Sequence, residues 1–214
     1  MDVRMFTVGP VAENCFIFRA DGARRALIVD PGEEPERLLR AVEELGVDIE
    51  AILLTHTHFD HIGAVAPVAR ATGAPVYCPE LETRVLADIM SFVPWPGFGP
   101  YESYEADETV RGGEKLELAG LEIDVLFVPG HSPGHVAYSI PAQEALFSGD
   151  VLFQGSVGRT DLPGGDWEAL ARSIATLVDT LAPETRVYPG HMGLTTLGRE
   201  RATNPFLREL PARR

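Results

Sequence analysis

Seven histidine and aspartate side chains follow apolar segments of this chain and could together bind metal ions. The densest group lies in Thr-His-Thr-His-Phe-Asp-His at residues 55–61 and consists of His56, His58, Asp60 and His61. The apolar run at residues 51–54 predicts a buried strand that ends where these donors begin. Imidazole and carboxylate at this density are typical of sites for divalent metals, and a pH-responsive surface loop is the alternative.

The other three donors, His131, Asp150 and His191, favour the metal site because they repeat the same context. Each follows a strand-like run and comes directly after a glycine. Loops that leave one edge of a sheet converge, and glycine allows the backbone to approach a site closely. One metal needs three or four protein ligands, so seven donors suit two metals if one carboxylate bridges them.

His-x-His-x-Asp-His, followed by a histidine, an aspartate and a histidine in this order, resembles the metallo-β-lactamase superfamily over nearly the whole chain. The resemblance implies an α/β fold in the form of a four-layer αββα sandwich. It implies a first metal held by His56, His58 and His131. It implies a second metal held by Asp60, His61 and His191, with Asp150 as the bridge.

Two positions narrow the branch of the superfamily. The β-lactamases lack an aspartate where this chain has Asp150, and flavodiiron proteins carry a glutamate where it has His58. The stretches at residues 155–166 and 203–207 resemble short bacterial members of the glyoxalase II-like group, the hydroxyacylglutathione hydrolases. Longer members add a C-terminal helical domain that binds glutathione. We therefore expect residues 1–214 to form a single domain without it, and glutathione as the carrier stays open.

The resemblance implies hydrolysis of a thioester such as S-lactoylglutathione. Two divalent ions, with zinc preferred and iron or manganese as alternatives, would lower the pKa of a shared water and provide a metal-bridging hydroxide as the nucleophile. A thiolate leaving group, with a parent pKa of about 8.5, needs no strong general acid. An amide or a lactone would need a proton, which Asp60 or a metal-bound water could supply, and Asp60 is the candidate catalytic residue.

Rival functions share this fold. Persulfide dioxygenases hold one iron, whose ligands would here be His56, His131 and Asp150. The histidine at position 135 favours the hydrolase, since glyoxalase II enzymes keep one there, and we expect it to be structural. A lactonase is a further alternative. A metal-binding protein without activity is disfavoured because the donor set is intact.

Composition excludes several classes of protein. With 214 residues and 45% hydrophobic content, the chain predicts a globular fold. Its net charge of −14 opposes nucleic-acid binding, so the expected partner is a small molecule. No apolar run approaches the ~20 residues of a membrane helix and the N-terminus lacks a signal-peptide core, so we expect a cytoplasmic protein without membrane contact. The oligomeric state is left open.

The elements that must position the donors follow from periodicity. Strands are expected within residues 2–30 and 106–147, and helices over 33–45, 62–72 (interrupted at Pro67), 80–90 and 166–181, the last with Asp166 as its N-cap. Strands and helices alternate in two similar halves, which agrees with the sandwich.

Substrate contacts are expected from a loop and an arginine. Residues 91–105 are rich in proline, glycine and aromatic residues, and Trp95 and Phe98 could contact substrate there. A structural flap or a dimer contact are the alternatives. Arg159 could bind a substrate carboxylate or pair with Asp161. Asp30 could orient a ligand imidazole or cap a turn.

Overall fold

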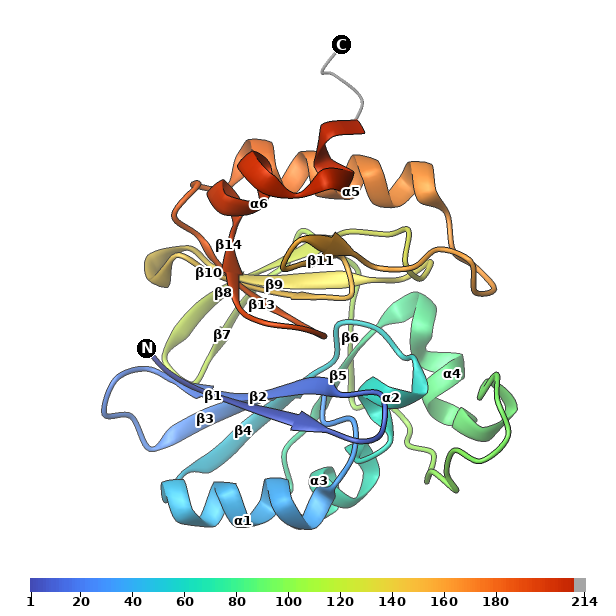
Figure 1. Cartoon of the computed structure of the whole chain (residues 1–214). Helices are drawn as coiled ribbons and strands as arrows, with labels where there is room; N and C mark the ends of the chain where they lie inside the picture. Colours follow the sequence, from blue (N-terminus) through green and yellow to red (C-terminus); the bar gives the residue numbers. More distant parts are fainter. Residues whose placement is uncertain (210–214) are drawn as a thin grey trace.

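Two six-stranded sheets pack face to face, and helices cover the outer face of each (Figure 1). The computed structural model describes residues 1–209, so the last five residues of the expected 1–214 domain lie outside the described part. The expected four-layer αββα sandwich is confirmed.

The first sheet is antiparallel at one edge and parallel at the other. β1 pairs antiparallel with β2 and β2 with β3, whereas β3 to β6 are mutually parallel. Its strands, in spatial order, are β1 (Asp2–Val8), β2 (Glu13–Arg19), β3 (Arg25–Val29), β4 (Asp48–Leu53), β5 (Val76–Pro79) and β6 (Glu108–Val110). Helices α1 (Pro35–Leu45) and α3 (Val65–Thr72) pack on its outer face (Figure 1).

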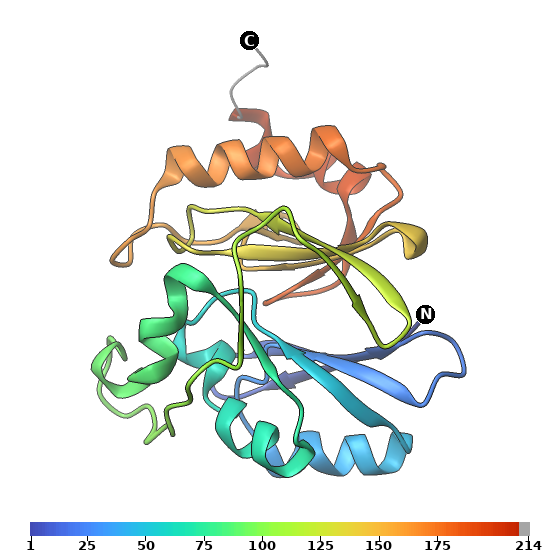
Figure 2. The same cartoon turned by 180° about the vertical axis from the view of Figure 1, so that it is seen from behind.

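The second sheet belongs to the C-terminal half. Its strands, in spatial order, are β14 (Thr195–Thr196), β13 (Arg186–Pro189), β10 (Ala145–Gly149), β9 (Val136–Ile140), β8 (Leu121–Phe127) and β7 (Lys115–Leu118). Helices α5 (Trp167–Thr180) and α6 (Leu197–Thr203) cover its outer face, and the short hairpin β11 (Leu152–Phe153)–β12 (Ser156–Val157) follows β10. Figure 2 shows the chain crossing once from the first sheet to the second, between β6 and β7.

Successive side chains of β3 and β4 point into two different hydrophobic cores, and this explains the continuous apolar runs in their sequences. In β3, Leu27 and Val29 enter the core between the two sheets, whereas Ala26 and Ile28 enter the core under the helices. In β4, Leu53 faces between the sheets and Ile52 faces the helices. Both faces of residues 26–29 in β3 and 51–53 in β4 are buried, so no polar position interrupts these two runs. These buried strands therefore give firm support to the loops that follow their C-terminal ends.

The predicted helices differ from the observed ones in two places. Pro67 lies in the first turn of α3 and does not interrupt it, because a first-turn residue needs no intrahelical N–H partner. The helix expected over 80–90 is instead α4 (Thr83–Ala87) between the 3₁₀ turns η1 (Glu80–Glu82) and η2 (Ile89–Ser91). Tyr104 N–H donates to the Leu86 carbonyl, which a longer α4 would have used itself.

Two other helix predictions are confirmed. Helix α1 lies within residues 33–45, and Asp166 caps α5 by accepting from Ala169 N–H at 3.0 Å. Among residues 1–209, no helix combines the length and the apolar character that a bilayer crossing requires. After α4 and η2, the loop up to β6 projects from the side of the sandwich (Figures 1 and 2).

Candidate metal centre

The seven candidate donors follow strand ends that meet at one edge of the sandwich. β8 and β10 are both antiparallel to β9, and β10 is parallel to β13, so these three strands run the same way. Their C-terminal ends carry the turns to His131, Asp150 and His191. The chain after β4 in the first sheet, together with the short α2 (Phe59–Ile62), supplies the other four. The sheets thus present donors to a shared space from two sides.

Glycine is required where these turns crowd together. Gly149, just before Asp150, has a φ of +49°, and a Cβ atom there would lie 2.4 Å from Thr55 Oγ1. A Cβ atom on Gly190, just before His191, would lie 2.3 Å from Asp150 Oδ1. The prediction that glycine here lets the backbone approach the site is confirmed.

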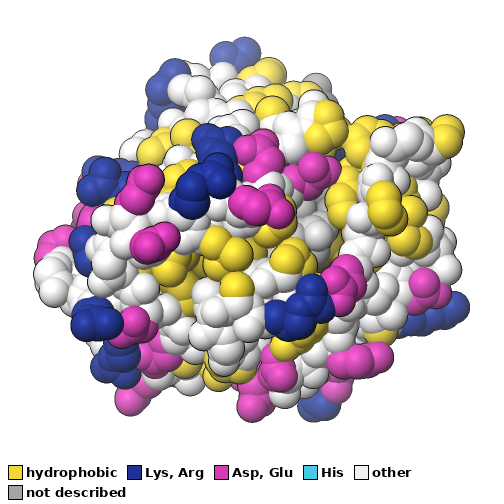
Figure 3. Space-filling model, turned by 90° about the horizontal axis from the view of Figure 1, so that it is seen from below, with side chains coloured by type: hydrophobic (Ala, Val, Ile, Leu, Met, Phe, Trp, Pro, Cys, Tyr) yellow, Lys and Arg dark blue, Asp and Glu magenta, His cyan; other side chains and the backbone are white. Residues whose placement is uncertain are grey.

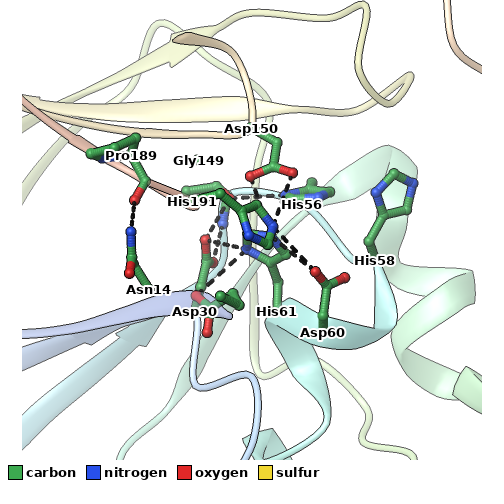
Figure 4. A network of polar contacts seen from close by, with 12 residues as sticks. Asn14, Asp30, His56, His58, Asp60, His61, Gly149, Asp150, Pro189 and His191 are labelled. Atoms are coloured by element: carbon green, nitrogen blue, oxygen red, sulfur yellow. Dashed lines mark hydrogen bonds and ion pairs between the residues drawn. The ribbon is translucent and has the colours of Figure 1, made fainter. Parts of the chain in front are cut away.

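One cluster of donors combines Asp60, His61 and His191. Their ligand-capable atoms all lie within 4.8 Å of one another. His191 Nε2 is 3.3 Å from Asp60 Oδ2, and His61 Nε2 is 3.9 Å from the same oxygen. Figure 4 shows the two imidazoles side by side above Asp60. This spacing leaves room for one ion among three donors.

A second cluster combines His56, His58 and His131, whose donor atoms also lie within 4.8 Å of one another. His131 Nε2 approaches His58 Nδ1 to 2.8 Å. The His56 ring contacts the other two edge-on, with centroids 4.7 and 4.8 Å away. The three donors of each set that the resemblance implies therefore lie close together in space.

Asp150 lies between the two clusters. Its Oδ1 is 3.4 Å from His61 Nε2, and its Oδ2 is 3.4 Å from His131 Nε2 and 3.5 Å from His191 Nε2. Among the described carboxylates, Asp150 alone forms ion pairs with histidines of both clusters, whereas Asp30 lies within 4.8 Å of His56 and His61. From this position the Asp150 carboxylate could bridge two metal ions.

Three of the imidazoles are oriented by acceptors behind them. His61 Nδ1 is 3.0 Å from Asp30 Oδ2, His131 Nδ1 is 2.8 Å from the Arg159 carbonyl, and His191 Nδ1 is 3.2 Å from the Ala12 carbonyl. Facing such acceptors, Nδ1 carries the proton and donates, so the Nε2 lone pair is directed into the cluster. Asp30 also accepts from Thr55 N–H and Oγ1–H, which fixes the carboxylate behind His61. Of its two predicted roles, the orientation of an imidazole has structural support.

Buried polar atoms without partners indicate that the donor set fits metal ions. His56 Nε2, His61 Nε2 and Asp150 Oδ1 are buried and have no hydrogen-bond partner within residues 1–209. Leaving such groups unpaired costs about 1–3 kcal/mol each. Two divalent ions would satisfy all three atoms, and the mixture of imidazole and carboxylate suits zinc, iron or manganese.

The protonation states of His56, His58 and Asp150 agree with this fit. His61 and His191, whose pKa values are raised because Asp150 and Asp60 outweigh burial, would release a proton when an ion binds. Burial, reinforced by neighbouring histidines, lowers the pKa of His56 well below its usual value and that of His58 to about 3. Burial by itself would raise the pKa of Asp150, but His61 and His191 outweigh it and hold that pKa below its usual value. Neutral imidazole and ionised carboxylate are the forms that coordinate metals.

Two glutamates of the site had no signal in the sequence. Glu82 is buried and accepts from Thr57 Oγ1–H, Ser132 Oγ–H and Gly134 N–H, each at 2.7 Å. It joins the loop of His56 and His58 to the loop of His131. Glu13 is fully buried with its Oε1 3.8 Å from His61 Nδ1, and burial raises its pKa. Both stand far from the donors in sequence, so only the fold reveals them.

His135 is a buried structural neighbour of the centre. Its Nε2 accepts from the backbone N–H of Asp150 at 3.0 Å, so it positions the turn that carries the aspartate. Its ring stacks on that of His56, with centroids 4.7 Å apart. These contacts agree with the structural role predicted for it.

A cavity of about 710 Å³ opens above the donors. Asp60, Asp150 and His191 line its floor, and Trp95 and Arg159, which are predicted to contact substrate, line its wall. Phe98, also expected to contact substrate, is not among the lining residues, because its ring packs against Phe59 with centroids 4.7 Å apart. Arg159 forms an ion pair with Asp161 at 2.6 Å, so the structural alternative for this residue is realised.

Comparisons with known proteins agree with the geometry. A family model described as the metallo-beta-lactamase superfamily matches residues 8–191. The chain is 36% identical to hydroxyacylglutathione hydrolase GloC of Haemophilus influenzae, over 97% of this chain and 98% of that protein. It resembles the crystal structure of BLEG-1 B3 metallo-beta-lactamase, with a TM-score of 0.91, 39% identity and coverage of 96% and 99% of the two chains. It also resembles TTHA1623 in a di-iron-bound form, with a TM-score of 0.84, 44% identity and coverage of 95% and 100%.

Proposed function

This chain belongs to the metallo-beta-lactamase superfamily, and we propose that it is a hydrolase that cleaves thioesters with two divalent metal ions at the floor of its cavity. The observation that carries the proposal is the pair of three-donor clusters joined by Asp150. His56, His58 and His131 would hold one ion, and Asp60, His61 and His191 the other. When bound, such ions supply a water of lowered pKa and polarise a carbonyl group.

The residues of the chain would fix where the reaction occurs. Asp150 and the Nε2 atoms directed by Asp30, Arg159 and Ala12 form a rigid floor, so donor positions need no rearrangement during the reaction. Asp60 lines the cavity, and its side chain is 13% exposed, so it can exchange a proton with a bound substrate. His61 and His191, whose attraction outweighs the effect of burial, hold the pKa of Asp60 below its usual value, so the carboxylate is ionised, which is the form that coordinates a metal.

A thioester fits this floor better than an amide. The thiolate leaves without a proton, since the parent thiol has a pKa of about 8.5. Apart from Asp60, the carboxyl groups that line the cavity are Asp150, which faces three histidines, and Glu82, whose oxygens accept three hydrogen bonds. The likeness to GloC supports the same class of substrate.

Hydrolysis of a β-lactam is the second candidate, favoured by the likeness to the structure named as a B3 metallo-beta-lactamase. A β-lactam is an amide, and its nitrogen leaves only after protonation. The position of Asp150 between the clusters also differs from the β-lactamase pattern described above. We therefore place this reaction second.

The experiment loads the metal-free protein with zinc, manganese or iron(II) and counts the ions bound per chain. Each form is then assayed with S-lactoylglutathione, an acetyl thioester, a cephalosporin and glutathione persulfide, the last with an oxygen electrode. We expect two ions per chain and thioester cleavage that chelation abolishes. One iron per chain with oxygen consumption, or cleavage of the cephalosporin alone, would overturn the proposal.

A further inference from the structure

The entrance of the cavity differs in character from its floor, and it indicates what kind of thioester enters. We propose that the thiol portion of the substrate is apolar and uncharged, and that anionic thiols such as glutathione are poor carriers for this enzyme. The inference rests on the proposed thioester hydrolase function and adds its substrate class. It is carried by five residues, here called the rim: Val11, Leu81, Phe92, Trp95 and Met192.

The rim gathers exposed apolar side chains in one place. Its members are 36% to 66% exposed, and they account for five of the eleven large hydrophobic side chains that are exposed in the described part of the chain. They come from four separate segments: the turn between β1 and β2, η1, the loop after η2 and the turn after β13. Four segments that place apolar groups around one opening form a binding surface, since scattered exposed residues would not converge.

The figures show where one part of the rim lies on the molecule. The lobe formed by α4 and the loop after it projects at the right of Figures 1 and 3. In Figure 3 hydrophobic side chains gather on this lobe and also in the middle of that face, among side chains of both charges. Phe92 and Trp95 belong to this loop. The part of the rim on this lobe therefore belongs to a region that exposes apolar side chains.

The side chains that line the cavity offer little to pair with an anionic thiol. Arg159 is the single lysine or arginine among the described lining residues, and Asp60, Glu82 and Asp150 are the acidic ones. Two N–H groups of Arg159 already donate to Asp161, at 2.6 and 2.7 Å. Its guanidinium also lies over the Trp95 ring, 5.7 Å from the centroid. A substrate carboxylate at the rim would have to displace Asp161 or remain without a cationic side chain as its partner.

Glutathione would present two carboxylates and one ammonium group to this entrance. Both carboxylates lose water on binding, and the lining offers one arginine, already paired, to replace it. An apolar thiol instead covers the rim and removes its surface from water, which is favourable. Both effects favour a thioester of an apolar thiol over one of glutathione. The preference should therefore be visible as a difference in kcat/KM between the two substrates.

The test uses three acetyl thioesters that share the reacting carbonyl and differ in the thiol: benzyl mercaptan, N-acetylcysteamine and glutathione. These are apolar, polar and neutral, and polar and anionic, respectively. With the metal-loaded protein we expect kcat/KM to fall in that order, with at least about a tenfold difference between the first and the last. An equal or higher kcat/KM for S-acetylglutathione would overturn the inference while the hydrolase proposal stands.

Two variants with a matched control locate the selectivity. Trp95→Ala should reduce the preference for the benzyl thioester by about fivefold, because the ring supplies much of the apolar contact. Trp167→Ala is the control, since Trp167 is 39% exposed, close to the 40% of Trp95, but does not line the cavity. Asp161→Asn frees Arg159 and should raise kcat/KM for S-acetylglutathione alone. If neither Trp95→Ala nor Asp161→Asn changes the ratio, the rim does not select the thiol.

A binding measurement separates failure of the inference from failure of the proposed reaction. The chain has two tryptophans, so in the Trp167→Phe variant the fluorescence reports Trp95 alone. This variant is titrated with benzyl methyl sulfide and with S-methylglutathione, neither of which can be hydrolysed. Tighter binding of the apolar sulfide without cleavage of any thioester would refute the hydrolase and support the rim selectivity. Tighter binding of S-methylglutathione would refute the selectivity.

Discussion

The floor and the rim of the cavity are built in opposite ways. The floor consists of polar donors, mostly buried, that follow the ends of strands in both sheets. The rim consists of exposed apolar side chains on turns and loops. The floor donors are packed among neighbouring groups, so a different side chain would not fit easily there. A rim side chain faces solvent on one side and can be replaced with less disturbance. We infer that the floor determines the reaction and the rim determines which substrate reaches it, and four substitutions test this division.

The largest effect is expected from Asp150→Ala. The substitution removes the carboxylate that contacts histidines of both clusters, so the metal content should fall below two ions per chain. Activity should fall by at least about 100-fold, beyond what is typical for residues that only hold a ligand in place. Metal analysis after dialysis and kcat measure the effect. Asp48→Ala is the control, since Asp48 is exposed and pairs with Arg24. Full metal content in Asp150→Ala would refute the bridging role.

Glu82→Ala should come next, because it acts on the floor without contacting the substrate. Removal of the carboxylate leaves three buried donors unpaired, which should lower the free energy of unfolding by about 3 kcal/mol. It should also weaken the affinity for one of the two ions by about 10- to 100-fold. Urea unfolding and metal titration measure these changes.

Glu82→Gln is the informative companion, since its amide can still accept from Ser132 and Gly134 and can donate to Thr57. It should recover most of the lost metal affinity. Glu80→Ala, in the same 3₁₀ turn but exposed, is the control for general destabilisation. An unchanged metal affinity in Glu82→Ala would show that this residue supports the fold alone.

A smaller effect is expected from Asp30→Asn. Asp30 has a φ of +49°, a conformation that asparagine also adopts, so the backbone should not be strained. The change weakens the charge-assisted bond to His61 Nδ1 and should reduce metal affinity about tenfold. Competition with a chelator measures the affinity. Asp107→Asn, an exposed carboxylate that accepts from Val76 N–H, should leave it unchanged. An affinity equal to that of the unaltered protein would contradict the orienting role.

The smallest effect is expected at the rim. Met192→Ala should leave metal content and kcat unchanged and raise KM for an apolar thioester by about two- to fivefold, because one flexible apolar contact is lost. Steady-state kinetics measure the change, with Met5→Ala as a control of similar exposure outside the cavity lining. A large fall in kcat would show that rim and floor are not separate in function.

The sequence predicted the layers of the fold for a specific physical reason. Strands such as β3 and β4 are buried on both faces, so their apolar runs are continuous and easy to recognise. The 3₁₀ turns around α4 were not predicted, because the Tyr104 N–H that takes the Leu86 carbonyl lies far along the chain. The contact of Phe98 with Phe59 in place of the cavity escaped prediction for the same reason.

The sequence by itself determined the types of the donors and their order along the chain. Metal binding needs imidazole and carboxylate groups, and in this chain they follow apolar runs that predict strands. It could not reveal Glu82 or Glu13, whose roles arise from distant segments packed against each other. Only the tertiary structure decided that Arg159 is already paired and that four separate segments converge as the rim. A donor is defined by its own chemistry, whereas a binding surface is defined by neighbours that the chain brings together only when it folds.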